Sequence, residues 1–396
     1  MGRSNKKNIT YVVSSGLCLK CGLCYSICPE NAIAIKGGID KNPIVNNNCV
    51  NCSRCVKVCP GLIPLSKNEK ETQLGIVRNC YIGYSMDNSI RKSSTSGGIV
   101  TSININLLQE ANYKGVICIR QKKDNIFENE VILATSIEDI LSSKGSRYAP
   151  AFVCGGLKDL NIKKGEKYVF VGKPCDIQAL TRYETIHRGY NFLKIALFCS
   201  RTPPMTATKE VLDSNNVDIQ EVRRLQYRGN GWPGWFIAYS SKKDEIKLQK
   251  EYLDVWDNIL CKIKYYNKRC MLCHDCTGEY ADISVGDAWL DEYIGNSIGH
   301  SVVITRSSIA DDIVRENIDR KNIMLGMVNE ETVLNSQKSL LNKKNNLFLK
   351  RVIGKLIFER LPEEDIPFNP STNDVKRIPG LLKYYILHKL IYRKQK

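Results

Sequence analysis

A twelve-residue cysteine motif occurs twice within the first 60 residues, and it constrains the fold more than any other feature of the sequence. Both copies have the spacing C-x2-C-x2-C-x3-C-P, and their cysteines are Cys18, Cys21, Cys24 and Cys28, then Cys49, Cys52, Cys55 and Cys59. The chain has 17 cysteines, and no apolar stretch of the kind found in secretory signals follows its first residues. We therefore expect a cytoplasmic chain with reduced thiols, in which metal ligation is favoured over disulfide bonds.

This doubled spacing is typical of proteins that hold two 4Fe-4S clusters. Three closely spaced thiolates bind one cluster, and the fourth cysteine of each run binds the other cluster. The sequence thus predicts one cluster on Cys18, Cys21, Cys24 and Cys59, and a second on Cys49, Cys52, Cys55 and Cys28. A zinc ribbon is the alternative, but it would leave four cysteines unused and both prolines unexplained.

A third group of cysteines lies much later, at Cys261, Cys270, Cys273 and Cys276. Its spacing can supply three or four ligands to one more 4Fe-4S cluster. Zinc is the alternative here, bound by four thiolates or by three thiolates and His274.

The middle of the chain has the pattern of an α/β core. Strands are expected over 80–85, 115–119, 168–171 and 193–198, helices over 99–110 and 177–183, and a hairpin over 235–248. Cys175 and Cys199 each follow a predicted strand, where ligands bind in α/β sheets, although buried structural cysteines are common. The predicted fold class is α+β or α/β, with a bacterial-ferredoxin-like dicluster domain before a mixed α/β region.

Six short stretches in this order resemble the coenzyme F420 hydrogenase/dehydrogenase beta subunits. They are 94–98 (STSGG), 144–148 (KGSRY), 171–175 (VGKPC), 197–199 (LFC), 270–276 (CMLCHDC) and 281–287 (ADISVGD). The resemblance implies a mixed α/β flavin-binding region, an FAD, a third 4Fe-4S cluster, and electron exchange with coenzyme F420 or a similar hydride carrier. It also implies that the cofactor is bound by Ser96, Gly97, Gly98, Lys144, Ser146, Arg147, Gly172 and Cys175. The third cluster would be bound by Cys261, Cys270, Cys273 and Cys276, with Cys175 or Cys199 as possible substitutes.

The expected domains are a dicluster domain over 1–66, a linker over 67–78, two parts of the flavin region over 79–155 and 156–330, and a basic extension over 331–396. The last 16 residues, 381–396, have an apolar stripe between basic residues. We expect a helix packed on its own domain there, with contact to a membrane surface as the less favoured alternative.

The formal net charge of +17 first suggests nucleic acid as a partner. No nucleic-acid motif accompanies it, so we expect none, and a basic surface also suits an acidic ferredoxin, an acidic flavodoxin or a partner redox subunit. The sequence indicates an oxidoreductase that joins hydride exchange at a flavin to one-electron transfer through 4Fe-4S clusters. The alternatives are a relay subunit without catalysis and a ferredoxin-driven reductase of another substrate. No catalytic side chain is assigned.

Overall fold

The computed structural model describes residues 8–36, 39–65, 73–110, 112–240, 245–294 and 297–342, together with five single positions between 379 and 390. Residues 67–72 of the expected linker lie outside this part of the chain. The 381–396 tail also lies outside it, except for four positions. No helix within the described residues is long and apolar enough to cross a membrane.

The N-terminal domain, residues 8–65, is built from very short elements, α1 (Thr10–Ser14), α2 (Leu23–Ser26), α3 (Arg54–Lys57), β1 (Ile33–Lys36) and β2 (Asn42–Val45). Helices α2 and α3 follow residues with positive φ, Gly22 at 87° and Ser53 at 64°. Each of the two helices carries the third cysteine of its motif, Cys24 or Cys55. The repeated motif therefore folds as a repeated turn followed by a single helical turn.

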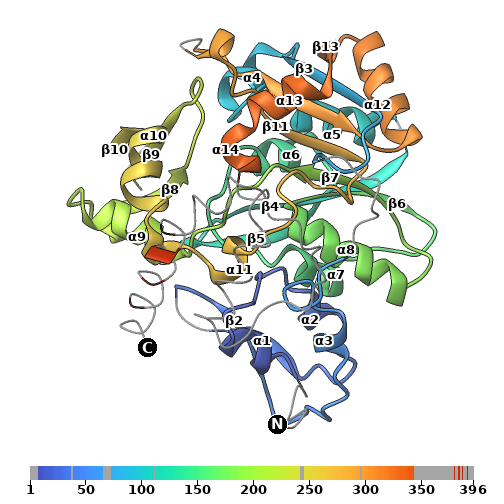
Figure 1. Cartoon of the computed structure of the whole chain (residues 1–396), viewed down its shortest axis with the longest axis vertical. Coiled ribbons are helices and arrows are strands. Elements are labelled where there is room, and N and C mark those ends of the chain that lie inside the picture. Colours follow the sequence, from blue (N-terminus) through green and yellow to red (C-terminus); the bar gives the residue numbers. More distant parts are fainter. Residues whose placement is uncertain are drawn as a thin grey trace.

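A mixed eight-stranded sheet forms the centre of the molecule (Figure 1). Its strands, in spatial order, are β13 (Ile323–Val328), β3 (Asn79–Ser85), β12 (Ser301–Thr305), β11 (Ile283–Asp287), β7 (Asn191–Leu197), β6 (Lys167–Gly172), β4 (Tyr113–Lys122) and β5 (Asn125–Ala134). Strands β4, β6, β7 and β11 are parallel, and the remaining pairings are antiparallel. The four strands predicted from the sequence are confirmed as β3, β4, β6 and β7.

Successive side chains of β6 point to opposite faces of this sheet and are buried on both. Val169 packs into one core beside α5 (Ile99–Glu110) and α12 (Ser308–Asp319). Tyr168 and Phe170 pack into a second core, with α8 (Pro174–Ile186) and α7 (Gly156–Asp159). That second core also contains Cys21, Leu23 and Ile27, so the N-terminal domain is docked on this face of the sheet. The period-two pattern of a strand buried on both faces accounts for the arrangement.

A smaller antiparallel sheet stands beside the large one, with strands in the order β10 (Ile246–Glu251), β9 (Trp235–Ser240) and β8 (Val222–Gln226) (Figure 1). It carries α9 (Met205–Asp213), α10 (Tyr252–Val255) and a π-helical turn (Trp256–Leu260). The predicted hairpin is confirmed as β9 and β10. The remaining α-helices of the described residues are α4 (Asn88–Ser93), α6 (Ile137–Ser143), α11 (Lys268–Met271), α13 (Glu330–Ser336) and α14 (Lys338–Leu341).

Candidate functional site

The eight cysteines of the repeated motif form two groups in the structure. Burial raises the pKa of Cys18 to about 11, and the nearby Cys59 adds to the rise. Burial and the nearby thiols of Cys18, Cys21 and Cys59 likewise raise the pKa of Cys24. In the second group, burial raises the pKa of Cys55 to about 11, with Cys52, Cys28 and Cys49 contributing. The fourth cysteine of each run therefore lies with the other run's first three, as the cluster assignment requires.

The surroundings of these thiols suit 4Fe-4S clusters. Backbone N–H groups point at the sulfurs, as from Lys20 to Cys18 Sγ at 3.4 Å and from Ala32 to Cys28 Sγ at 3.3 Å. Such N–H···S bonds stabilise thiolates and tune cluster potentials. Apolar side chains, Leu17 and Leu62 among them, pack against the same cysteines. The donor set and its environment thus fit the group that the spacing predicts.

A third group of thiols gathers at the carboxyl ends of β6 and β7. Burial, with Asp176 adding to its effect, raises the pKa of the Cys175 thiol far above its ordinary value, and Cys199 and Cys270 also contribute. The Cys199 backbone N–H donates to the Cys276 carbonyl oxygen at 3.0 Å. A hydrogen bond with Cys276 lowers the pKa of Cys273 to about 7. Cys175, Cys199, Cys270, Cys273 and Cys276 therefore lie together, although they are far apart in sequence.

Cys261 has a different environment. Its carbonyl oxygen accepts a hydrogen bond from Arg201 Nη1 at 3.0 Å, and among the described residues its thiol is not one of those that act on the pKa of Cys175 or Cys273. Within the described ranges, no three or more His, Cys, Asp or Glu side chains are arranged to hold a single metal ion, which is what the zinc alternatives need. His274 is 4% exposed and its Nε2 lies 3.1 Å from Gln178 Nε2.

A cavity of about 640 Å³ opens at the same edge of the large sheet. The residues around it come from the ends of several strands, because β6, β7 and β11 are parallel and end together. The small sheet closes the opposite side with Arg228, Tyr252 and Trp256. Its size is that of a site for a cofactor or a small substrate. Cys199 lines this cavity, so the third group of thiols borders it directly.

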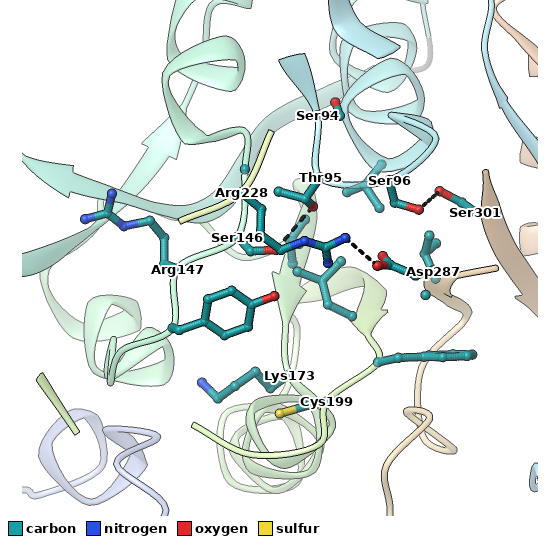
Figure 2. A pocket seen from close by; sticks show the side chains of 18 of the residues that line it. Ser94, Thr95, Ser96, Ser146, Arg147, Lys173, Cys199, Arg228, Asp287 and Ser301 are labelled. Atoms are coloured by element: carbon teal, nitrogen blue, oxygen red, sulfur yellow. Dashed lines mark hydrogen bonds and ion pairs between the residues drawn. The ribbon is translucent and has the colours of Figure 1, made fainter. Parts of the chain in front are cut away.

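The 94–98 loop forms one wall of the cavity through Ser94, Thr95, Ser96 and Gly98 (Figure 2). Ser96 Oγ donates to the His300 carbonyl oxygen at 2.8 Å and lies 3.0 Å from Ser301 Oγ. Gly97 does not line the cavity, and its N–H donates to Ser301 Oγ at 2.9 Å. A Cβ at Gly97 would meet the Gly83 carbonyl oxygen at 2.5 Å. Gly97 thus permits a close approach of two backbones, which fixes the loop on β3 and β12.

The 144–148 segment supplies a second wall. Lys144 Nζ donates to Ser93 Oγ at 2.8 Å, and desolvation lowers the pKa of this lysine. Ser146 Oγ donates to Thr95 Oγ1 at 3.2 Å, which joins the two walls. Figure 2 shows the Arg147 guanidinium directed away from Arg228.

The bonds of Arg147 explain this orientation. Its guanidinium binds Gln121 Oε1 on β4, Asn129 Oδ1 on β5 and the Leu225 carbonyl oxygen on β8. Arg147 therefore ties the small sheet to the large one in addition to lining the cavity.

A buried ion pair crosses the cavity between the two sheets. Arg228 Nη2 lies 2.7 Å from Asp287 Oδ2, and these side chains are 5% and 14% exposed (Figure 2). Burial acts to lower the pKa of Arg228, but the Asp287 carboxylate outweighs it and the pKa is raised. The Arg228 guanidinium also lies 4.5 Å from the centre of the Tyr252 ring. The Arg228 guanidinium therefore stays positively charged beside the Asp287 carboxyl group.

A second ion pair lies beneath the cavity at the start of α8. Lys173 Nζ donates to Asp176 Oδ2 at 2.6 Å, and both residues line the cavity together with Gly172. Burial opposes the charge on Lys173, yet Asp176 and Cys175 raise the lysine's pKa. Lys173 lies beside Cys199 in Figure 2. A cation is thus held between the cavity and the third group of thiols.

Five buried polar atoms on residues that line this cavity have neither a hydrogen-bond partner nor an ion-pair partner among the described residues. They are Ser94 Oγ, Asn104 Oδ1, Arg147 Nη2, Asp176 Oδ1 and Arg201 Nε. Unpaired buried polar groups are costly and rare, so such a concentration indicates a polar ligand. The set contains both donors and acceptors. Five cations, Lys144, Arg147, Lys173, Arg201 and Arg228, line the cavity with two carboxylates, Asp176 and Asp287, which favours an anion.

Sequence reasoning did not assign Lys173, Arg201, Asp287 or Arg228 to the site. The rule that identified Cys175 and Cys199 also applies to the first three, because each lies at or just after the carboxyl end of a strand. Arg228 follows a strand of the other sheet, and only the packing of two sheets brings it to Asp287.

The sequence matches models of known protein families over most of the described region. The model for the N-terminal part of the coenzyme F420 hydrogenase/dehydrogenase beta subunits matches residues 80–158, and the model for their C-terminal part matches residues 165–331. A 4Fe-4S dicluster domain matches residues 17–62. Together the two beta-subunit models cover more than half of the chain.

Among similar proteins, the coenzyme F420-dependent sulfite reductase of Methanocaldococcus jannaschii is 24% identical over 76% of this chain. The chain spans only 46% of that protein's length. One of the subunits of the F420H2 dehydrogenase of Methanosarcina mazei is 26% identical, over 74% of this chain and 82% of that relative.

A solved structure has the same fold, namely a chain of the F420-reducing [NiFe] hydrogenase complex from Methanosarcina barkeri. The TM-score is 0.56 at 20% sequence identity, over 76% of this chain and 99% of that one. The mixed α/β fold class expected from the sequence is confirmed. This chain belongs to the family of coenzyme F420 hydrogenase/dehydrogenase beta subunits, a family of oxidoreductases, and it carries a 4Fe-4S dicluster domain ahead of the family's N-terminal region.

Proposed function

We propose that this protein is an iron–sulfur flavoenzyme that exchanges a hydride with coenzyme F420 or a similar carrier and transfers single electrons through three 4Fe-4S clusters. The observation that carries the proposal is the cavity with its five unpaired polar atoms, bordered by the third group of thiols. An FAD bound there would supply the chemistry that joins a two-electron carrier to one-electron carriers.

The residues around the cavity suit a flavin with a diphosphate. Lys144 and Arg201 supply positive charge for phosphate oxygens. The Arg201 guanidinium stacks on the Tyr266 ring at 3.9 Å, and its buried Nε has no hydrogen-bond partner among the described residues. Tyr252 and Trp256 offer aromatic surface for a ring system. Asn104 Oδ1 and Asp176 Oδ1 accept hydrogen bonds, and Ser94 Oγ donates one. Ser96 and Gly98 shape the wall, and Gly97 holds it in place.

The cysteine groups suggest an order for the clusters. The first motif cluster would use Cys18, Cys21, Cys24 and Cys59, and the second Cys49, Cys52, Cys55 and Cys28. The third would use Cys270, Cys273 and Cys276, with Cys175 or Cys199 in place of Cys261. The cavity borders the third group of thiols, and Cys24 of the first group lies near Cys55 of the second group. A one-electron partner is expected at the dicluster end, either an acidic ferredoxin or flavodoxin or a partner subunit.

Flavin binding provides the first test. We expect the anaerobically purified chain to bind FAD, and Arg201→Met to weaken the affinity about ten- to hundredfold, because one hydrogen bond to a charged group is lost. Lys209→Met is the matched control, since Lys209 is an exposed lysine on α9 paired with Asp213 and outside the cavity lining. Equal FAD affinity in both variants would contradict the assignment of the cavity.

Reduction by the carrier provides the second test. Reduced coenzyme F420 added anaerobically should bleach the flavin absorbance and then the cluster absorbance. A chain that holds clusters but binds no flavin would instead be a relay subunit. Bleaching by reduced ferredoxin alone would identify a ferredoxin-driven reductase of another substrate.

A further inference from the structure

Helix α11, which carries Cys270, is fastened to the dicluster domain by three consecutive residues. Asn267 Nδ2 donates to the Cys18 carbonyl oxygen at 3.2 Å. Lys268 Nζ donates to the Ser15 carbonyl oxygen at 2.9 Å, and Arg269 Nε donates to that of Gly61 at 2.9 Å. The segment that carries Cys270, Cys273 and Cys276 therefore begins where the chain is hydrogen-bonded to the domain of the first cysteine group.

Arg269 is the most deeply buried of these three, at 2% exposure. Besides the bond to Gly61, its Nη1 donates to the Leu272 carbonyl oxygen at 2.6 Å, and its Nη2 lies 3.5 Å from His274 Nδ1. The two carbonyl oxygens that accept its hydrogen bonds carry no net charge. Within the described part of the chain this guanidinium makes no ion pair with a carboxylate, so its positive charge has to be balanced by another group.

The two nearest cysteine groups surround this charge. Gly61 is two residues after Cys59, and Leu272 directly precedes Cys273. The guanidinium acts on the pKa of a thiol in each group. It opposes the burial that raises the pKa of Cys59, and it helps to lower the pKa of Cys273. The guanidinium thus lies between the first group and the third.

A buried, uncompensated cation is strongly unfavourable. Four thiolates around an oxidised 4Fe-4S cluster leave a net charge of about −2, which becomes more negative when the cluster takes up an electron. A fixed positive charge nearby stabilises the reduced form more than the oxidised form. Arginine suits this role, because it stays protonated and its planar fork binds several acceptors at once.

We propose that Arg269 is a positioning residue that serves two cluster sites at once: it locks the Cys270–Cys276 segment onto the dicluster domain and raises the reduction potentials of the first and third clusters together. This rests on the third cluster of the proposed function. The charge makes both clusters easier to reduce, so one electron can pass between them without a large difference in potential. No proton moves in this step.

Arg182 on α8 provides a matched control. Its Nη2 donates to the carbonyl oxygens of Ile63 and Pro64 at 2.7 and 3.2 Å, in the same segment that Arg269 grips. Its guanidinium also lies near Cys59. Arg182 and Arg269 both act on the pKa of Cys59, whereas Arg269 also acts on that of Cys273. Arg182 is thus a half-buried arginine beside the first of the two groups.

The experiment is a redox titration of the full-length protein, loaded with iron and sulfide and reduced stepwise with dithionite under anaerobic conditions. Cluster signals are followed by electron paramagnetic resonance, and the signal missing in Cys270→Ser is assigned to the third cluster. We expect Arg269→Met to lower the midpoint potentials of two clusters. Arg182→Met should lower that of the first cluster alone. Arg269→Lys should retain wild-type potentials, because it keeps the charge.

Each contrary result has a distinct meaning. Unchanged potentials in Arg269→Met, at about twelve irons per chain as in the wild type, would overturn this inference and leave the proposed function intact. If Arg269→Met fails to assemble, lowered potentials in Arg269→Lys would overturn the role of the charge, and retained potentials would support it. A wild-type chain with about eight irons would remove the third cluster, and this inference with it.

Discussion

The dicluster domain and the eight-stranded sheet are stabilised in different ways. The domain over 8–65 has helices of four or five residues, and three of the nine buried residues in its apolar cluster are cysteines. The sheet has strands of up to ten residues, and its core side chains, such as Val169 and Ile195, have no exposed surface. We infer that the first region depends on bound metal and the second on apolar burial. The comparison shows how one chain can combine a metal-dependent part with a part that folds around its own core.

Iron removal should break this comparison most severely. We expect chelation to unfold residues 8–65 and to leave the large sheet folded, because ligand-bound clusters supply folding energy that a domain of about 60 residues otherwise lacks. Hydrogen exchange followed by mass spectrometry measures both regions in one sample. Retained protection of residues 8–65 without iron would contradict the expectation, as would simultaneous melting of β6 and β7.

A core truncation should have the next largest effect. Ile195→Ala removes a fully buried side chain from β7, and we expect it to lower the free energy of unfolding of the sheet by about 2–5 kcal/mol. Met327→Ala is the control, since Met327 is 70% exposed on the edge strand β13 and should change stability by less than about 0.5 kcal/mol. Denaturant unfolding measures both, and the iron content of the two variants should be equal.

The junction between the regions can be tested at Gly22. Its φ is +87°, and a Cβ there would meet the backbone nitrogen of Gly155 at 2.5 Å. Gly22→Ala should therefore weaken docking of the two regions, seen as faster amide exchange at Phe152 and Cys154, whose N–H groups donate to Lys20 and Cys21 carbonyl oxygens.

Gly165→Ala separates strain from collision. Gly165 has a φ of +81° but nothing within 4 Å of its missing Cβ, so this variant carries only the cost of backbone strain, about 1 kcal/mol. If the two variants changed exchange at Phe152 and Cys154 equally, close packing at Gly22 would not be what holds the regions together.

The smallest expected effect concerns Glu210 on α9. Although burial acts to raise its pKa, hydrogen bonds from Lys264, Tyr265 and Lys262 lower the pKa to about 2. A carboxylate with a depressed pKa contributes stability above its ordinary value of 4.5 and loses it as the pH falls towards 2. In the iron-free protein, Glu210→Gln should therefore unfold with less dependence on pH in this range. An unchanged pH dependence would show that these bonds contribute nothing to stability.

The sequence was most informative where chemistry depends on local spacing. The two cysteine runs predict a dicluster domain from twelve residues each, and a matching dicluster model confirms that domain. Periodicity correctly predicted β3, β4, β6 and β7, because each lies in the large sheet with a strongly apolar pattern. The Arg228–Asp287 pair was not predictable in this way, since its members belong to different sheets.

Arg269 shows the same limit from another side. In the sequence it is one of 58 basic residues, next to a cysteine and without any motif of its own. Only the docking of Gly61 against α11 makes it a buried contact between two groups of thiols. Long-range packing, rather than composition or periodicity, determines which basic residues come to lie beside the cysteine groups.

The exposure of the second cysteine group has a kinetic consequence. Cys52 is exposed and its neighbour Val50 is 63% exposed, whereas the cavity lies at the other end of the series of cysteine groups. A redox protein that docks over Cys52 would leave the cavity open, so the two reactants would not compete for one surface. We expect the dissociation constant of either reactant to stay unchanged when the other reactant is saturating. An inhibitor that binds over Cys52 and one that binds in the cavity should act independently.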